Sequence, residues 1–463
     1  MRDSVIGVTV IGSVTGQSYV GGLLGMAGGT LSDAAYIGNV TGNSAVGGIA
    51  GHKRDGSSKL EFTGNVLGYA SGAGECGVGG IFGLAAGNGY THVALKTAGT
   101  VSCSDVSNTK APNTGGIIGR ADQSRIEDSE NRATVIGGDR TTGIIGTSNG
   151  TTTFVNTRNY GNVTGWNDVA GFIAYTSFGN NVFQDSINYG NITSNSGSYR
   201  VAGIASALEA NGCCAHKMIN VQNYGNISGG NESGGLLGNS NYITFTDVAN
   251  YGNVSGVYND VGGIAGKCTG CIMTNVKNFG NVTGANNAVG GIAGTYMGTI
   301  TGGSSSGTIT GNNAVGGIVG NFNANATYPG QVTGMTSTAN IIGTVGGTGS
   351  GGIIGALNSG YSSSTPVIVE KSSFSGSIKA NSQCGGIVGQ INQFATVRRT
   401  SMTGGSIECN TASGGIIGLV NNNNVLVEQS FSKGKVKGLT YAGGFVGHVQ
   451  RLPANSVAFN DNY

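Results

Sequence analysis

The chain has 463 residues, of which 90 are Gly, 4 are Pro and 10% are charged, while hydrophobic residues make up 38%. Glycine does not recur at every third position and aliphatic residues recur throughout, so neither a collagen helix nor a disordered chain is expected. The formal charge of +2 gives no basic footprint for nucleic acid, and we expect no nucleic-acid partner.

The first 25 residues carry no targeting pattern. They lack the basic, hydrophobic and small-residue order of a signal peptide, and no stretch of about 18 apolar residues occurs anywhere in the chain. We therefore predict no direct membrane insertion. Because the repeat described next starts almost at Met1, we also expect the sequence to be a mature or excised part of a longer precursor.

A short motif, small–Gly–aliphatic–x–small, recurs about every 30 residues from "GGLLG" at residue 21 to "GGFVG" at residue 443. Its copies start at residues 21, 47, 79, 115, 142, 170, 202, 234, 262, 290, 316, 351, 385, 414 and 443. A second segment precedes each copy, for example "GNVTG" at 38–42 and "GTITG" at 307–311, and a looser third segment precedes many of these, for example "ITFTDV" at 243–248.

The second segment alternates polar and aliphatic residues, which is typical of a strand buried on one face. Gly, Asn, Ser and Thr are weak helix formers, so the repeat favours strands and turns. We predict an all-β protein, a parallel β-solenoid (β-helix) of about 15 coils of roughly 26–36 residues, each with three short strands. Residues 1–449 would form one solenoid domain and residues 450–463 a C-terminal tail. A β-propeller is the rival fold, but this many units exceeds the usual number of blades.

The GG-aliphatic-x-Gly copies resemble the GLUG motif, and the resemblance covers nearly the whole chain. The copies at 142, 170 and 202 depart from it by losing one or both flanking glycines. Proteins with GLUG repeats are often bacterial surface or secreted proteins, including adhesin-like molecules and IgA1-protease-like peptidases. The resemblance therefore implies an extracellular module. It does not imply zinc-peptidase activity, because the chain contains no HExxH motif.

Charged residues concentrate in one stretch, "RADQSRIEDSENR" at 120–132, followed by Asp139 and Arg140. Its carboxylates could serve a β-helical glycosidase or lyase, with a nearby arginine holding an acidic sugar. These candidates are Glu127, Asp128 and Glu130, with Arg125 or Arg132. The alternative is a solvated face of mixed charge. The four histidines lie in distant repeats and none suggests a catalytic triad.

The segment "NYGNVTG" at 159–165 and its close copies predict ladders, because equivalent side chains stack in neighbouring coils. The Asn after the Gly would form an outward column, Asn162, Asn191, Asn226, Asn253 and Asn281, with hydroxyl residues beside it. The Asn before the aromatic, at 159, 188, 223, 250 and 278, would turn a corner, where Asn tolerates left-handed geometry and bonds its own backbone. An aromatic column would contain Tyr160, Tyr189, Tyr224, Tyr251 and Phe279, serving either cross-strand packing or a carbohydrate-binding strip.

The same segments contain Asn-x-Ser/Thr sequons, which are candidate glycosylation sites if the chain passes a glycosylating secretory route. The candidates are Asn39, Asn162, Asn191, Asn226, Asn253 and Asn281. Since all six share one phase of the repeat, the repeat itself also explains their number.

Eight cysteines are present. Cys76 and Cys103 occupy equivalent places in successive repeats, as do Cys384 and Cys409, so we predict the bridges Cys76–Cys103 and Cys384–Cys409. Such bridges would indicate an oxidising compartment. Disulfides, free thiols or a metal site remain open for the other four, Cys213, Cys214, Cys268 and Cys271.

These patterns together predict an extracellular or cell-surface structural protein, without enzymatic activity or cofactor, that displays Asn, Thr and Tyr ladders to a carbohydrate or cell-surface ligand. The enzyme near residues 120–140 is the alternative. The repeats run nearly from end to end, so we also expect either flanking domains or end-to-end self-association into a fibre.

Overall fold

The computed structural model describes residues 4–462 apart from 70–76, 88, 105–112, 177–178, 196–198, 210–215, 345–348, 359–365, 393, 422–423 and 451–456. Within that part of the chain the regular structure consists of 61 strands, from β1 (Val5–Ile6) to β61 (Val457–Asn460), without a helix. Accordingly, the described residues include no helix that could cross a bilayer.

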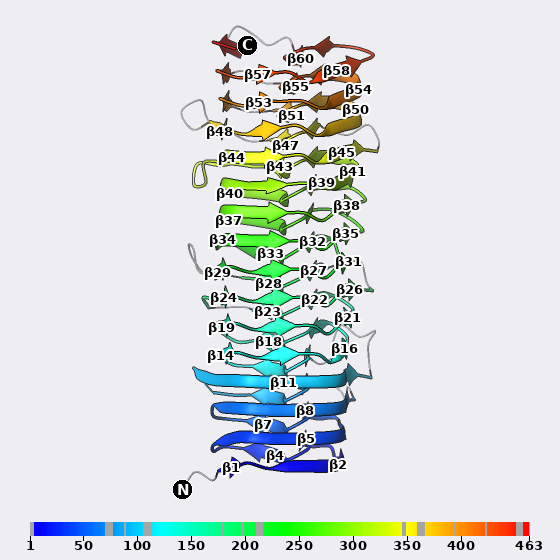
Figure 1. The fold of residues 1–463 in the computed structure, drawn as a ribbon, viewed down its shortest axis with the longest axis vertical. Coiled ribbons are helices and arrows are strands. Elements are labelled where there is room, and N and C mark those ends of the chain that lie inside the picture. Colours follow the sequence, from blue (N-terminus) through cyan, green and yellow to red (C-terminus); the bar gives the residue numbers. More distant parts are fainter. Residues whose placement is uncertain are drawn as a thin grey trace. The chain divides into compact units, whose positions relative to one another are not determined.

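The chain divides into two compact units. Unit 1 comprises residues 1–230 and 236–240, and unit 2 comprises residues 231–235 and 241–463. Each unit is a parallel β-solenoid, in which every turn of the chain stacks its strands on those of the turn before (Figure 1). The predicted fold class is thereby confirmed.

The first turns of unit 1 have the predicted three strands. One turn comprises β5 (Leu31–Gly42), β6 (Ser44–Gly47) and β7 (Ala50–Lys53), and the next comprises β8 (Ser57–Gly68), β9 (Gly77–Gly79) and β10 (Phe82–Ala85). β5 and β8 pair without a register shift from Leu31↔Ser57 to Gly42↔Gly68. In later turns corners divide the long strand, as in β19 (Thr152–Val155), β20 (Arg158–Asn159) and β21 (Val163–Gly165).

Two series of strands recur in unit 1. The strands that follow the glycine motif are β4 (Leu24–Ala27), β7, β10, β13 (Ile118–Ala121), β18 (Ile145–Ser148), β23 (Ile173–Thr176), β28 (Ala205–Leu208) and β33 (Leu237–Asn241). The strands of the "GNVTG" type are β2 (Thr9–Thr15), β5, β8, β11 (Tyr90–Cys103), β16 (Thr134–Ile136), β21, β26 (Ile192–Ser194) and β31 (Ile227–Ser228).

Unit 2 repeats the same plan. Its strands after the motif are β37 (Ala265–Asn278), β40 (Ala293–Ser305), β43 (Val319–Phe322), β47 (Ile354–Leu357), β51 (Val388–Ile391), β55 (Ile417–Val420) and β60 (Val446–Val449). Its "GNVTG"-type strands are β35 (Val254–Gly256), β38 (Val282–Gly284), β41 (Thr308–Gly311), β45 (Asn340–Gly343), β50 (Ser377–Gly385), β54 (Ser406–Gly414) and β58 (Lys435–Gly438). Within residues 450–463, β61 pairs in parallel with β56 (Val425–Glu428), so part of the segment predicted as a tail continues the solenoid.

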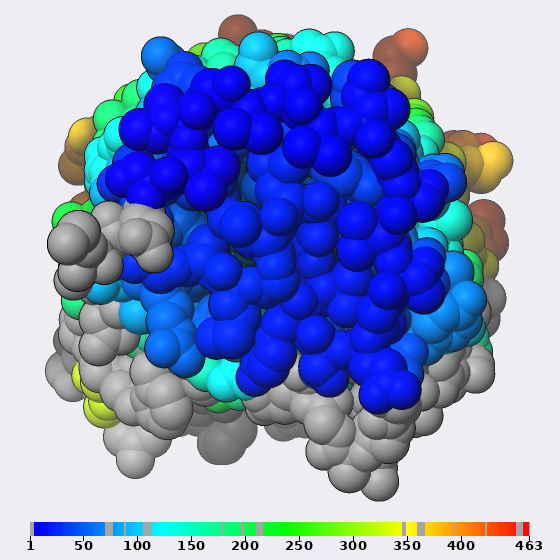
Figure 2. All heavy atoms as spheres, turned by 90° about the horizontal axis from the view of Figure 1, so that it is seen from below, coloured from blue at the N-terminus to red at the C-terminus, as the bar shows by residue number. Residues whose placement is uncertain are grey.

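Aliphatic columns fill the interior of each unit. Apart from those of the end strands β2 and β58, the inward residues of the "GNVTG"-type strands are at most 1% exposed, and they stack in register from turn to turn. The unit 1 column contains Val40, Val66, Val101, Val135, Val163, Ile192 and Ile227, and the unit 2 column contains Val254, Val282, Ile309, Ile341, Ile378 and Ile407. Seen from the N-terminal end of unit 1, the atoms of the first turns, in blue, pack closely over the end face (Figure 2).

The glycines of the repeated motif are required by close backbone approach. A Cβ built on Gly116 would lie 2.2 Å from the carbonyl oxygen of Gly143, one turn further on. A Cβ on Gly119 would lie 2.3 Å from the backbone nitrogen of Val78. Real side chains do not approach a backbone so closely, so the motif marks the places where strands and turns pack without side chains between them.

Residues with positive φ line one corner of each solenoid. In unit 1 this corner contains Asp33, Lys59, Ala94, Asp128, Asn156, Asp185 and Asn220, with φ between 47° and 54°. The left-handed conformation costs about 1 kcal/mol for a residue other than glycine, and Asn and Asp tolerate it best. The predicted corner residues, the Asn before the aromatic at 159 and its equivalents, are not among the residues with positive φ. The left-handed geometry was therefore wrong for these residues, whereas the corner is present, because β20 ends at Asn159 and β21 starts at Val163. The Asn ladder described below gives the reason for their conformation.

Substituting Gly116 by Ala should lower the free energy of unfolding by about 3 kcal/mol, because the added methyl would overlap the Gly143 carbonyl and force the turns apart. Gly28→Ala is the matched control in the same unit, since a Cβ there meets nothing within 4 Å. Urea unfolding of both variants measures the difference, and equal stabilities would contradict the role given to the motif.

Two buried histidines make unit 1 sensitive to acid. His92 is 2% exposed and its Nδ1 lies 2.9 Å from the Ser57 hydroxyl. Burial, with a smaller contribution from the nearby Lys53 ammonium, lowers the pKa of His92 from 6.5 to about 3. Burial also lowers the pKa of His216 to about 4. Both imidazoles are therefore neutral in the folded chain at neutral pH.

The unfolded chain binds a proton at His92 near pH 6.5, whereas the folded chain does not until about pH 3. Stability should therefore fall as the pH drops through this window, by about 3 kcal/mol at about pH 4.5 from His92 alone. Urea unfolding at about pH 7.5 and pH 4.5 should show a smaller loss for His92→Phe than for the wild type. An identical loss would exclude His92 as a source of the acid sensitivity.

Candidate functional site

A ladder of buried asparagines runs through unit 1. The Nδ2 atom of Asn131 donates to Oδ1 of Asn159 at 2.8 Å, Asn159 donates to Asn188 at 2.7 Å, and Asn188 donates to Asn223 at 2.7 Å. The hydroxyl of Thr97 donates to Asn131 at 2.6 Å and begins the series. All five side chains are at most 2% exposed. Each amide thus satisfies its neighbour in the next turn.

The same amides also bond their own backbone. Nδ2 of Asn159 donates to the carbonyl of Gly161 at 2.9 Å, and Asn188 bonds Gly190 in the same way at 2.8 Å. In unit 2, Asn250 donates to Asn278 at 2.8 Å and to the carbonyl of Gly252 at 2.7 Å. The Asn of "NYGN" is therefore an inward ladder residue. Its two donor hydrogens serve the ladder and the local turn, which explains why it faces the core.

The outward residues of the "GNVTG"-type strands of unit 1 form three adjacent columns, which we call the polar face. The central column contains Ser13, Asn39, Asn65, Thr100, Thr134, Asn162, Asn191 and Asn226. On one side stand Ile11, Ile37, Thr63, Ala98, Arg132, Tyr160, Tyr189 and Tyr224, and on the other Thr15, Thr41, Leu67, Ser102, Ile136, Thr164, Thr193 and Ser228. Arg132 is the one charged residue among these described positions.

Hydrogen bonds between turns fix the central column. Oδ1 of Asn162 accepts from the backbone N–H of Asn191 at 3.0 Å, and Oδ1 of Asn191 accepts from the N–H of Asn226 at 2.9 Å. In unit 2, Asn253 and Asn281 are related in the same way at 2.9 Å. The predicted outward Asn column is thus present in each unit. Because Oδ1 is bound to the backbone, the NH₂ group is the part of Asn162 and Asn191 that remains to donate outward.

The aromatic column is stacked face to face. The ring centroids of Tyr160 and Tyr189 lie 4.9 Å apart with planes 4° apart, and those of Tyr189 and Tyr224 lie 5.2 Å apart. The guanidinium of Arg132 lies 4.5 Å from the Tyr160 ring centroid and covers the ring face that is turned toward the preceding turn. In unit 2, Tyr251 and Phe279 stack at 5.0 Å. The faces that would pack against a sugar ring are therefore occupied by neighbouring rings, and the edges and hydroxyl groups remain exposed.

The candidate glycosylation residues are all exposed side chains: Asn39, Asn162, Asn191, Asn226, Asn253 and Asn281. Glycosylation at them stays a prediction. Asn162, Asn191 and Asn226 follow one another in adjacent turns, about 4.8 Å apart by strand spacing. Neighbouring rungs are too close for a branched glycan on each, so full occupancy would be incompatible with this stacking.

Two disulfides are present among the described residues. Cys384 and Cys409 are bonded, as predicted, and join adjacent turns with their Cα atoms 6.1 Å apart. Cys268 and Cys271, whose pairing the sequence left open, form the second bond and enclose Gly270, where the pairing register of β37 shifts. Cys103 is buried at the end of β11, while Cys76, Cys213 and Cys214 lie outside the described residues.

The carboxylates proposed for an enzyme are each engaged by a neighbour. Glu127 pairs with Arg125, and Glu130 accepts from Nε of Arg132 at 3.2 Å. Asp128 lies at the left-handed corner and accepts from Asn156 at 2.6 Å. Glu127 and Glu130 lie on β14 (Ser124–Glu127) and β15 (Glu130–Asn131), on either side of that corner. This pattern matches the alternative of a solvated face of mixed charge.

A second charged cluster in unit 1 was not identified from the sequence. Arg200 donates from Nε and Nη2 to the carboxylate of Asp168 at 2.8 and 3.2 Å, and the Asp168 side chain is 8% exposed. Burial raises the pKa of Asp168, and the Arg200 guanidinium opposes this rise. One turn earlier, Arg140 lies 4.9 Å from the ring centroid of Tyr175. Pairing accounts for Asp168 and Arg200, whereas the buried Nε of Arg140 has no hydrogen-bond partner among the described residues.

The sequence does contain a signal for this cluster. It adjoins the three motif copies that lose flanking glycines, where Thr142, Ala170 and Ala202 replace the first one. A Cβ on Gly146 would still lie 2.4 Å from the carbonyl oxygen of Gly119, close to the 2.3 Å between a Cβ on Gly119 and the backbone nitrogen of Val78. The signal is therefore the loss of the flanking glycines, and the turns pack as closely there as in the preceding turn.

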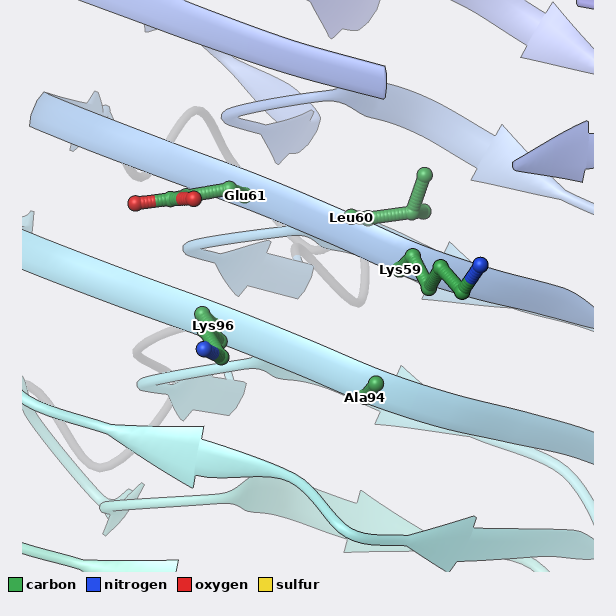
Figure 3. A pocket seen from close by; sticks show the side chains of 5 residues that line it. All are labelled: Lys59, Leu60, Glu61, Ala94 and Lys96. Carbon is green, nitrogen blue, oxygen red and sulfur yellow. The ribbon is translucent and has the colours of Figure 1, made fainter. Parts of the chain in front are cut away.

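A pocket of about 210 Å³ opens on β8 and β11. Lys59, Leu60 and Glu61 line it from one strand and Ala94 and Lys96 from the next (Figure 3). It forms because Ala94 carries only a methyl group at the left-handed corner, where the neighbouring turn has Lys59. Lys59 is already paired with Asp33 at 3.2 Å, and the lining contains charges of both signs. Its chemistry therefore selects no ligand. Among the described residues, no group of three or more His, Cys, Asp or Glu side chains is arranged to hold a metal ion.

Replacing Asn188 by Ala should lower the free energy of unfolding by about 3 kcal/mol. The Nδ2 donor of Asn159 and the Oδ1 acceptor of Asn223 would each lose the hydrogen bond to Asn188 inside the core. Thr97→Val is the matched control at the start of the ladder and should cost about 1 kcal/mol, since it removes a single bond. Denaturant unfolding compares them. Equal costs would show that the ladder does not act as a connected series.

The comparisons with known proteins give no relative. No family model matches the chain, and neither a curated protein nor a solved structure matches it. The likeness to GLUG repeats therefore stays a prediction from the motif residues, and function has to be argued from the geometry of the two units.

Proposed function

We propose that this protein is an extracellular, non-enzymatic structural and adhesive module, in which the solenoid holds a rigid laddered surface toward a carbohydrate or cell-surface ligand. The observation that carries the proposal is the polar face of unit 1. Its side chains are repeated in register, fixed by hydrogen bonds between turns, and almost without charge. The turns of Asn162, Asn191 and Asn226 offer the same kinds of side chain in succession, which suits multivalent attachment.

The cysteines support an extracellular location. Two pairs, Cys268–Cys271 and Cys384–Cys409, are bonded, and disulfides persist mainly in oxidising compartments. The GLUG-like repeats point to the same setting, because they resemble those of bacterial surface and secreted proteins. End-to-end self-association stays a prediction that we do not need for this function.

The enzymatic alternative has weaker support. A glycosidase needs a pair of carboxyl groups free to meet one glycosidic bond. Near residues 120–140, the carboxylates of Glu127, Asp128 and Glu130 are instead bonded to Arg125, Asn156 and Arg132. We propose no cofactor, since the display of a polar surface requires none.

Beads coated with the full chain test the proposal when passed over surfaces of mucin, fibronectin, neutral polysaccharide, acidic polysaccharide and albumin. We expect retention on at least one ligand surface to exceed that on albumin by about tenfold, without release of reducing ends or unsaturated sugars from the polysaccharides. Release of sugar would instead support the enzyme. Equal retention on every surface would exclude adhesion to these ligand classes.

A further inference from the structure

We infer that the polar face of unit 1 is a docking surface for a neutral, linear polysaccharide that lies along the columns, across successive turns. The inference rests on the adhesive function proposed above and narrows its ligand to one chemical class. Three properties of the face support it. These are the hydrogen-bonding groups that remain available to a ligand, the spacing of these groups along the columns, and the lack of a free charged group.

In the turns of Asn162 and Asn191, the groups that remain to bond are amide NH₂ groups and hydroxyls; elsewhere on the face Asn65 and Ser102 already donate to Asn39 and to the Val66 carbonyl. Oδ1 of Asn162 and Asn191 accepts a backbone N–H, which holds each amide in one orientation with its NH₂ group left to donate. Hydroxyl residues such as Thr164 and Thr193 stand beside them in register. Sugar hydroxyls both donate and accept, so they can match this mixture. Carbonyl-rich ligands supply acceptors alone.

The spacing favours a polymer of sugar rings. Successive rungs repeat at one interstrand distance, about 4.8 Å, whereas residues on one side of an extended peptide repeat at about 6.8 Å. The side chains of a peptide along the column would therefore no longer lie opposite the side chains of the face after one or two turns. A pyranose ring in an extended chain advances by a distance close to one rung. The turns that carry Asn162, Asn191 and Asn226 can therefore offer similar contacts to successive rings.

Apolar groups on the face add to this fit. Ile11, Ile37 and Ile136 are 76%, 44% and 39% exposed, and they interrupt the polar residues of the two outer columns. The stacked tyrosines expose ring edges, so their contribution is hydroxyl bonding and edge contact instead of face stacking. Sugars present CH groups and hydroxyls on the same ring, and a surface of mixed character can satisfy both.

The charge of the face favours a neutral ligand. Its one charged residue, Arg132, is engaged by the Glu130 carboxylate and by the Tyr160 ring. An acidic polysaccharide or a nucleic acid would find no free cation there, and phosphate contacts normally dominate nucleic-acid affinity. The corresponding surface of unit 2 becomes charged in its later turns, with Lys379, Glu408 and Lys437. Unit 2 therefore provides a natural contrast with the same backbone.

Affinity electrophoresis of the full chain in gels containing soluble β-1,4-glucan, amylose or polygalacturonate tests the inference. We expect one of the neutral polymers to retard the wild type and polygalacturonate not to. In Thr164→Lys/Thr193→Lys, two ammonium groups enter the polar face, and the dissociation constant for the neutral polymer should rise about tenfold. Circular dichroism and the unfolding midpoint confirm that the variant is folded.

Thr91→Lys/Thr153→Lys is the matched control. It adds the same charge to a different face of unit 1, on β11 and β19, and should change the dissociation constant less than about twofold. The inference fails if no neutral polymer retards the chain, if polygalacturonate alone does, or if both double variants weaken binding equally. If the beads are retained on mucin or fibronectin but no neutral polymer retards the chain, this inference is contradicted. The adhesive function proposed above would then still be supported.

Discussion

Parallel stacking in register is the constraint on which the rest of this structure depends. Because each strand pairs with the equivalent strand one turn away, almost every side chain meets its own counterparts above and below at one interstrand distance. A residue is therefore acceptable only if it tolerates a column of similar residues. Valine and isoleucine satisfy this inside, asparagine satisfies it by amide bonding, and glycine satisfies it where backbones touch.

The sequence predicted those features that depend on the repeat alone. The glycine motif, the inward Val163 and Ile192, the outward Asn162 and Asn191 and the bridge between Cys384 and Cys409 all follow from aligning equivalent positions. The inside or outside placement of Asn159 did not follow, because an Asn suits a corner and a buried ladder equally well in sequence. Its burial depends on the backbone carbonyl of Gly161 lying within reach, which only the folded turn determines.

The charged cluster was missed for a related reason. Asp168 and Arg200 are 32 residues apart in the chain, and they pair only because strand register places them in neighbouring turns. The carboxylates near residues 120–140 were recognised as a group, but their outward directions and partners could not be read from spacing. Strand register thus determines which polar residues lie next to one another. The charged residues that looked like a catalytic group in the sequence are instead paired with neighbours in the fold.

The buried Asn ladder has a direction, since each amide donates to the next turn along the chain from Asn131 to Asn223. A turn that carries its own Asn presents an acceptor to the turn before it and a donor to the turn after it. Such a turn is an interchangeable module, and duplication or loss of whole modules would leave every remaining bond intact. The length of such a protein can therefore change in evolution by unequal recombination between repeats. A new junction is stable only if its two turns can form the buried Asn–Asn hydrogen bond.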